Sequence, residues 1–75
     1  MTNVQLDATG LKCPLPVLKA GKAIKQVPVG GTLEVRATDP GSVEDFAAFC
    51  DGPELELVSH DRDGDVFCFL IRKNG

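Results

Sequence analysis

The fold of this chain is decided by residues 32–38, the stretch TLEVRAT. Leu33, Val35 and Ala37 would face one side of an extended strand, whereas Glu34 and Arg36 would face the other. Such alternation is typical of a sheet with one solvated face and one covered face. We therefore expect every helix of this chain to lie on the same side of its sheet.

Two helices are available to cover that side. Apolar residues recur at helical spacing from Pro14 to about Val27, and the stretch PVGG at 28–31 then ends the pattern. The apolar face of this helix comprises Val17, Ala20, Gly21, Ile24 and Val27. A second helix is predicted to begin near Ser42 and to stop at the stretch DGP, residues 51–53. Its apolar face comprises Val43, Phe46, Ala47 and Cys50.

Three further strands complete the pattern, at Val4–Asp7, Glu54–His60 and Asp65–Lys73. The stretch DRDGD at 61–65 predicts a solvated hairpin turn between the last two, since its glycine is misplaced for a calcium loop. The order βαβαββ, with a right-handed crossover that makes the first two strands parallel, predicts an α+β fold. We expect a two-layer α/β sandwich, with a mixed four-stranded sheet and both helices on one face. The last strand is apolar on both sides, so it is either central or covered by a partner.

Length and composition limit the function. The 75 residues are enough for one domain, residues 1–75, and leave little room for a deep substrate pocket beside a core. The net charge of −3 argues against direct binding of nucleic acid, and no apolar run approaches the roughly 20 residues that span a bilayer. The N-terminus lacks the pattern of a secretory signal, and three cysteines suit a reducing compartment. We expect a cytoplasmic protein that is monomeric, does not bind membranes and needs no cofactor.

One thiol has an unusual setting. Cys13 stands in the stretch LKCPLP, residues 11–16, directly before the first helix. Pro14 suits the first helical position, and each of the two prolines biases the residue before it toward extended geometry. A helix N-terminus favours an anion by about 0.3–1 kcal/mol, so we expect the pKa of Cys13 to lie below the usual value of about 8.5, with help from Lys12. A thiolate or persulfide at this position could react with another protein.

The alternatives are weaker. Cys13 could be a small buried apolar residue, and dithiol redox chemistry lacks a resolving cysteine because position 16 is proline. Cys50 and Cys68 fit structural roles, and His60, the single histidine, fits a surface position. A zinc site formed by these four residues would lack paired ligand spacing, so we expect no metal. Lys19, Lys22 and Lys25 form either a solvated helix face or a surface that steers an acidic docking partner.

The residues around Cys13 resemble a known signature. Residues 6–8 (LDA) and 10–17 (GLKCPLPV) are similar to the motif of the TusA/SirA-like sulfur-carrier family. Downstream, Asp39-Pro40, Asp45, Phe49-Cys50 and the final stretch LIRKNG, residues 70–75, resemble its TusA branch. The resemblance covers residues 6–75, and a Cys-Pro-x-Pro motif between a first strand and a first helix is specific.

The resemblance implies the same βαβαββ sandwich and makes Cys13 the acceptor of a persulfide. Gly10, Leu11 and Lys12 then precede it in the motif, and Pro14 and Pro16 are the motif prolines. The implied donors are cysteine desulfurases or rhodanese-type sulfurtransferases, and the implied acceptors include DsrE-like relay proteins. The pathways served by the family include tRNA thiolation, molybdenum-cofactor synthesis and sulfur oxidation. No role is implied for Cys68.

Three functions therefore compete. A sulfur carrier would hold a covalent persulfide on Cys13, as a sulfurtransferase does, with no turnover on its own. A non-catalytic regulatory or protein-interaction module would instead tolerate Cys13→Ser and depend on the helix lysines. A stand-alone thiol enzyme would need a pocket and a placed base, and the sequence indicates neither.

Overall fold

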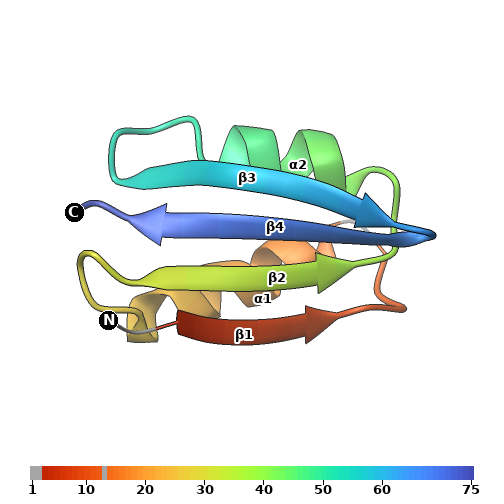
Figure 1. Ribbon diagram of the computed structural model, residues 1–75, viewed down its shortest axis with the longest axis horizontal. Coiled ribbons are helices and arrows are strands. Elements are labelled where there is room, and N and C mark those ends of the chain that lie inside the picture. The colour runs from red at the N-terminus through yellow and green to blue at the C-terminus, as the bar shows by residue number, and fades with distance from the viewer. Residues whose placement is uncertain (1–2, 13) are drawn as a thin grey trace.

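The computed structural model describes residues 3–12 and 14–75. Four strands and two α-helices follow one another in the predicted order βαβαββ, with one short 3₁₀ helix, η1, after the first α-helix (Figure 1). Their bounds are β1 Asn3–Ala8, α1 Leu15–Ala23, η1 Ile24–Gln26, β2 Thr32–Ala37, α2 Ser42–Phe49, β3 Leu55–Asp63 and β4 Val66–Lys73.

The sheet is mixed, with the strand order β1-β2-β4-β3. β1 and β2 are parallel, with Leu6 opposite Val35, and β4 runs antiparallel to both of its neighbours. β4 has a neighbouring strand along each edge. β2 is also central but carries Glu34 and Arg36 on the open face, so the central position alone does not account for the apolar residues of β4 on that face. Of the two alternatives for that strand, the central position is confirmed.

Both helices cover one face of the sheet, so the prediction of two layers is confirmed (Figure 1). The core lies between the layers and buries alternate residues of β2 and β4, as the pattern of residues 32–38 requires. Its buried members are Ala8, Ala20, Ile24, Val27, Leu33, Val35, Ala37, Phe46, Phe69 and Ile71. The rings of Phe46 and Phe69 stack with their centroids 4.6 Å apart, which joins α2 to the sheet.

Some details differ from the predictions. The first helix is α-helical only to Ala23 and continues as η1, which ends where Val27 becomes extended. Ala47, predicted on the apolar face of α2, is exposed; Phe49 packs against the core instead, and its ring meets that of Phe46 edge-on. Residues 61–63 belong to β3 rather than to the turn, because their pairing with β4 continues to Asp63.

A β-bulge divides β3 into two parts. Leu57 lies opposite Ile71 but Ser59 lies opposite Leu70, so one extra residue stands between them. The extra residue reverses the alternation beyond it. His60 and Arg62 consequently lie beside Phe69 and Phe67 on the face that the helices cover.

The two ends of the sheet carry different segments of the chain. The carboxyl ends of β1 and β2, the starts of both α-helices and the β3–β4 turn lie at one end, on the right in Figure 1. The opposite end carries Asn3, Thr32 and the C-terminal residues. From Asn3 to Ala8, β1 advances by five residue steps, which separates the two ends of the sheet by about 17 Å. Within residues 3–12 and 14–75, neither α-helix has the length and apolar character needed to cross a bilayer.

Candidate functional site

The candidate site begins where β1 ends. Asp7 Oδ1 accepts hydrogen bonds from the hydroxyl of Thr9, at 2.6 Å, and from the Thr9 amide, at 3.0 Å. The hydroxyl bond, followed by the amide bond, lowers the pKa of Asp7 because both favour the carboxylate. This local turn directs the chain away from the sheet and toward the helix layer.

Gly10 sets the path of the next residues. Its φ is +80°, in the left-handed region that glycine enters without steric cost. Its amide donates to Thr38 Oγ1 at 2.8 Å, which links the β1–α1 loop to the residue that follows β2. The two loops at this end of the sheet are therefore held to one another.

The residues that follow anchor the loop on both sides of position 13. Leu11 is half-buried against the core and donates its amide to the Ala8 carbonyl at 3.4 Å. Lys12 is exposed, and its carbonyl accepts the Leu15 amide at 2.9 Å. The motif thus keeps an apolar side chain inward and a cation outward directly before position 13.

The two motif prolines occupy different environments. Pro14 is the exposed N-cap residue of α1, and its carbonyl accepts the Leu18 amide at 3.1 Å. Pro16 lies in the first turn and is fully buried, so it fixes the helix start against the protein. Neither proline has an amide hydrogen and the Leu15 amide is bound to the Lys12 carbonyl, so these three residues offer an anion no N–H group; the helix dipole would still favour the anion.

The positive end of α1 is not neutralised by its own side chains. Among the described residues, no side chain caps α1 and none in its first turn is acidic. An anion near this end would therefore meet a positive potential that Lys12 reinforces. Cys13, the predicted acceptor of sulfur, lies outside the described residues.

The predicted docking lysines do not all lie together. Lys19 and Lys22 line a groove of about 360 Å³ between α1 and β1, together with Leu6, Ala23 and Gln26. Lys25 is exposed but lies in η1, roughly 15 Å along the helix axis from Pro14. A partner centred on the helix start would meet Lys19 and Lys22 before Lys25.

The remaining thiols are distant from the motif. Cys50 follows α2 at the end opposite the loop, and burial raises the pKa of its thiol. Cys68 is a half-buried free thiol on the sheet face that the helices leave open, because it alternates with the inward Phe67 and Phe69. Among residues 3–12 and 14–75, no group of three possible ligand side chains could hold a metal ion.

His60 is exposed, and its ring lies 6.4 Å from that of Phe69. It stands on β3, the edge strand farthest from β1, about 14 Å from Leu6 across three strand steps. The structure therefore does not bring this imidazole next to the β1–α1 loop.

The sequence analysis did not single out Arg62, a cation at the end of the sheet that leads into the motif. The Arg62 guanidinium carbon lies 5.5 Å from the centre of the Phe67 ring, and Arg62 Nε donates to the Gly64 carbonyl at 2.7 Å. Arg62 pairs with Phe67, and the same cross-strand row continues through Ala37 to Ala8. Arg62 therefore lies level with the last residues of β1 and β2, at the end of the sheet that leads into the motif. No local signal predicts this position, because it depends on the bulge.

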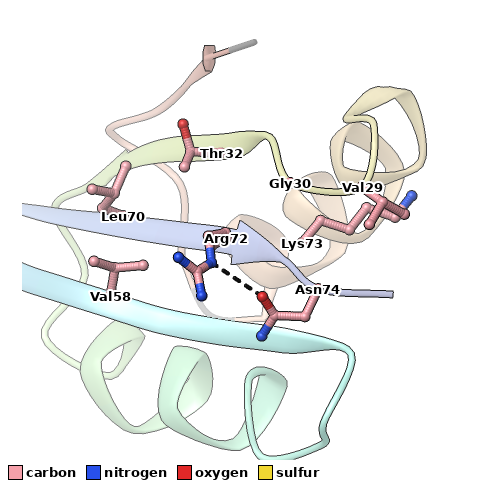
Figure 2. A pocket seen from close by; sticks show the side chains of 8 residues that line it. All are labelled: Val29, Gly30, Thr32, Val58, Leu70, Arg72, Lys73 and Asn74. Carbon is pink, nitrogen blue, oxygen red and sulfur yellow. Dashed lines mark hydrogen bonds between the residues drawn. The ribbon is translucent and has the colours of Figure 1, made fainter. Parts of the chain in front are cut away.

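A second groove lies away from the motif. It holds about 490 Å³ on the open face, at the end with the C-terminus (Figure 2). Its lining comprises Val29, Gly30, Thr32, Val58, Leu70, Arg72, Lys73 and Asn74. Arg72 is already engaged with Asn74 and Glu56, with nitrogen–oxygen distances of 3.1 Å and 3.0 Å. This groove therefore offers no uncommitted guanidinium to an anion.

Comparison with known proteins identifies relatives along nearly the whole chain. The family model described as sulfurtransferase TusA matches residues 4–73. The sulfur carrier protein TusA of Allochromatium vinosum is 49% identical over 70 residues, which cover 93% of this chain and 92% of that protein. Both matches include the β1–α1 loop and the first turn of α1.

Proposed function

Because the chain belongs to the TusA family and is a sulfur carrier, we propose that Cys13 is the residue on which it carries sulfur. The observation that carries this proposal is the family match across residues 4–73, which contain a single Cys-Pro-x-Pro motif. The described residues support it: the helix that starts at Pro14 has no acidic residue in its first turn, and Lys12 adds positive charge.

The proposed transfer is two successive displacements at sulfur. The Cys13 thiolate attacks the outer sulfur of a donor persulfide, a new S–S bond forms, and the donor cysteine leaves as a thiolate. The acceptor thiolate then attacks the outer sulfur of the Cys13 persulfide and releases the Cys13 thiolate. No net oxidation occurs, so the chain needs no cofactor of its own.

The remaining residues of the motif position this chemistry. Gly10 and Leu11 fix the loop through the Thr38 bond and the core contact, and buried Pro16 holds the helix start. Lys12 and the helix lysines Lys19, Lys22 and Lys25 attract an acidic partner surface, and Lys19 and Lys22 act closest to the transferred sulfur.

The proposed donors are a cysteine desulfurase or a rhodanese-type sulfurtransferase, and the proposed acceptors include DsrE-like relay proteins. We assign the chain to the cytoplasm as one domain, residues 1–75, that exchanges partners as a monomer. The pathway follows from whichever acceptor is used: tRNA thiolation, molybdenum-cofactor synthesis or sulfur oxidation.

Mass spectrometry tests the proposal directly. After incubation with a cysteine desulfurase and cysteine, or with a rhodanese and thiosulfate, the wild-type chain should gain about 32 Da for one sulfur. Cys13→Ser should abolish this gain, whereas Cys50→Ser and Cys68→Ser, the matched controls, should retain it. A wild-type chain that stays unmodified with both donors would refute the carrier proposal and favour a regulatory module.

A further inference from the structure

Large apolar side chains are exposed at two places in the described residues 3–12 and 14–75. Leu15 and Leu18 are 45% and 56% exposed in the first two turns of α1, and Val29 and Val58 are 66% and 46% exposed at the open-face groove. Leu15 is the x residue of the Cys-Pro-x-Pro motif and Leu18 stands two residues beyond it, whereas the two valines line the groove near the C-terminus.

Internal packing does not account for Leu15 and Leu18. The side of α1 that meets the core is supplied by Pro16 and Ala20, which are buried, and Ile24 of η1 continues it. Residues three apart on a helix are surface neighbours, so the leucine side chains form one continuous apolar patch beside exposed Pro14. Burying a leucine side chain fully stabilises a protein by roughly 1.5–3 kcal/mol. About half of the surface of each of these leucines still contacts solvent, so a partner that covers it would gain part of that free energy.

Positive charge borders this patch. Lys12 precedes it, Lys19 stands one helical turn beyond Leu15, and Lys22 stands one turn beyond Leu18. All three lysines are exposed, and the first turn of α1 contributes no acidic side chain. An apolar centre with a charged rim is the usual anatomy of a protein–protein interface.

We infer that Leu15 and Leu18 form the centre of the surface that binds the sulfur-donor protein, through an apolar hollow bordered by aspartate or glutamate. The inference rests on the proposed function, because Leu15 belongs to the sulfur-carrying motif and Leu18 stands two residues beyond it. Two leucines and a proline make a small contact, which suits a carrier that must dissociate after each transfer.

The experiment measures donor-dependent loading of Cys13 at varied concentrations of the carrier. The donors are a cysteine desulfurase supplied with radiolabelled cysteine and a rhodanese supplied with labelled thiosulfate, and the faster one is used. Leu15→Gln and Leu18→Gln preserve helix propensity and remove the apolar surface. Val29→Gln and Val58→Gln are the matched controls, since they remove exposed apolar surface at the other end.

The double leucine variant should lower kcat/KM by about tenfold, mainly through a higher KM. The valine variants should load like wild type, and alkylation of Cys13 by iodoacetamide should proceed at the same rate in all chains. Circular dichroism and urea midpoints verify that each variant is folded.

Three results would overturn the inference. Leucine variants that are loaded as fast as wild type would show that the patch does not bind the donor, and would leave the proposed carrier function intact. Equal losses in the leucine and valine variants would show a general effect of lost apolar surface. A wild-type chain that neither donor loads would refute the proposed function itself, and the docking surface with it.

Discussion

The Gly10→Ala variant tests how the backbone conformation of the motif loop affects stability and sulfur loading, because it changes none of the side chains that carry out the chemistry. Gly10 has a φ of +80°, and its amide binds Thr38 Oγ1 at 2.8 Å. Apart from its two chain neighbours, no heavy atom of the described residues would lie within 4 Å of a Cβ atom built on Gly10. The substitution therefore introduces no steric clash with its surroundings, and its cost arises from the backbone alone.

The size of that cost follows from two opposing effects. Left-handed backbone costs a non-glycine residue about 1–2 kcal/mol. Alanine also restricts the unfolded chain, which returns about 0.4–1 kcal/mol of stability. The two ranges leave a net loss of at most about 1.6 kcal/mol, with about 0.8 kcal/mol at their midpoints, and each kcal/mol lowers the Tm of a domain of this size by roughly 4–8 °C.

Loading of Cys13 should fall as well. If residue 10 rotates to a negative φ to relieve the strain, its amide turns away from Thr38, and the loop that carries Leu11 and Cys13 shifts with it. The donor would then meet a displaced thiol, so we expect a severalfold lower loading rate. Urea denaturation measures the stability loss, and the mass gain per unit time measures the loading.

Gly30→Ala is the matched control. Gly30 has a φ of +89°, open space at its Cβ and an amide bonded to the Lys73 carbonyl, but it lies at the opposite end of the molecule. The Gly30→Ala variant should lose a similar amount of stability, but its Cys13 should be loaded with sulfur at the wild-type rate. D-alanine at position 10, in a chemically synthesised chain, should restore both properties. Normal loading by Gly10→Ala, or slow loading by Gly30→Ala, would refute the reasoning.

The other predictions concern stability. Phe69→Ala should destabilise the fold by about 3–5 kcal/mol in urea titrations, because it empties a buried site against Phe46; a loss below about 1 kcal/mol would contradict that packing. Burial raises the pKa of the Cys50 thiol above its ordinary value of 9.0, so stability should fall above about pH 9, where the thiol ionises more readily in the unfolded chain. Cys50→Ala should weaken that fall, and identical pH profiles would disprove it. Glu56→Gln, which breaks the half-exposed pair with Arg72, should lower the free energy of unfolding in urea titrations by no more than about 1 kcal/mol, and by less at high salt.

The sequence predicted the features that depend on near neighbours. Alternation over residues 32–38 correctly placed Leu33 and Val35 in the core, and the spacing of Ala20 and Ile24 correctly defined the buried face of the first helix. Helical spacing was less reliable in α2, where Ala47 is exposed. The exposed leucines also had a sequence signal, because Leu15 and Leu18 stand outside the apolar face of an amphipathic helix.

The strand order and the contacts between loops could be established only from the tertiary structure. The sequence left the position of β4 in the sheet open, and only its pairing with both β2 and β3 showed that it is central. The bond from the Gly10 amide to Thr38 joins residues 28 positions apart, and no periodicity in the chain indicates it. Such contacts depend on which segments become neighbours after folding.

The amino-acid sequence by itself determined the order of the elements, the buried side of β2 and the motif that contains Cys13, because periodicity and turn chemistry act over a few residues. Only the tertiary structure decided that the bulge at Val58 turns Arg62 toward Phe67 at the motif end of the sheet. The physical reason is that register is set by two strands together: one inserted residue reverses every later side chain, and its position depends on the partner strand.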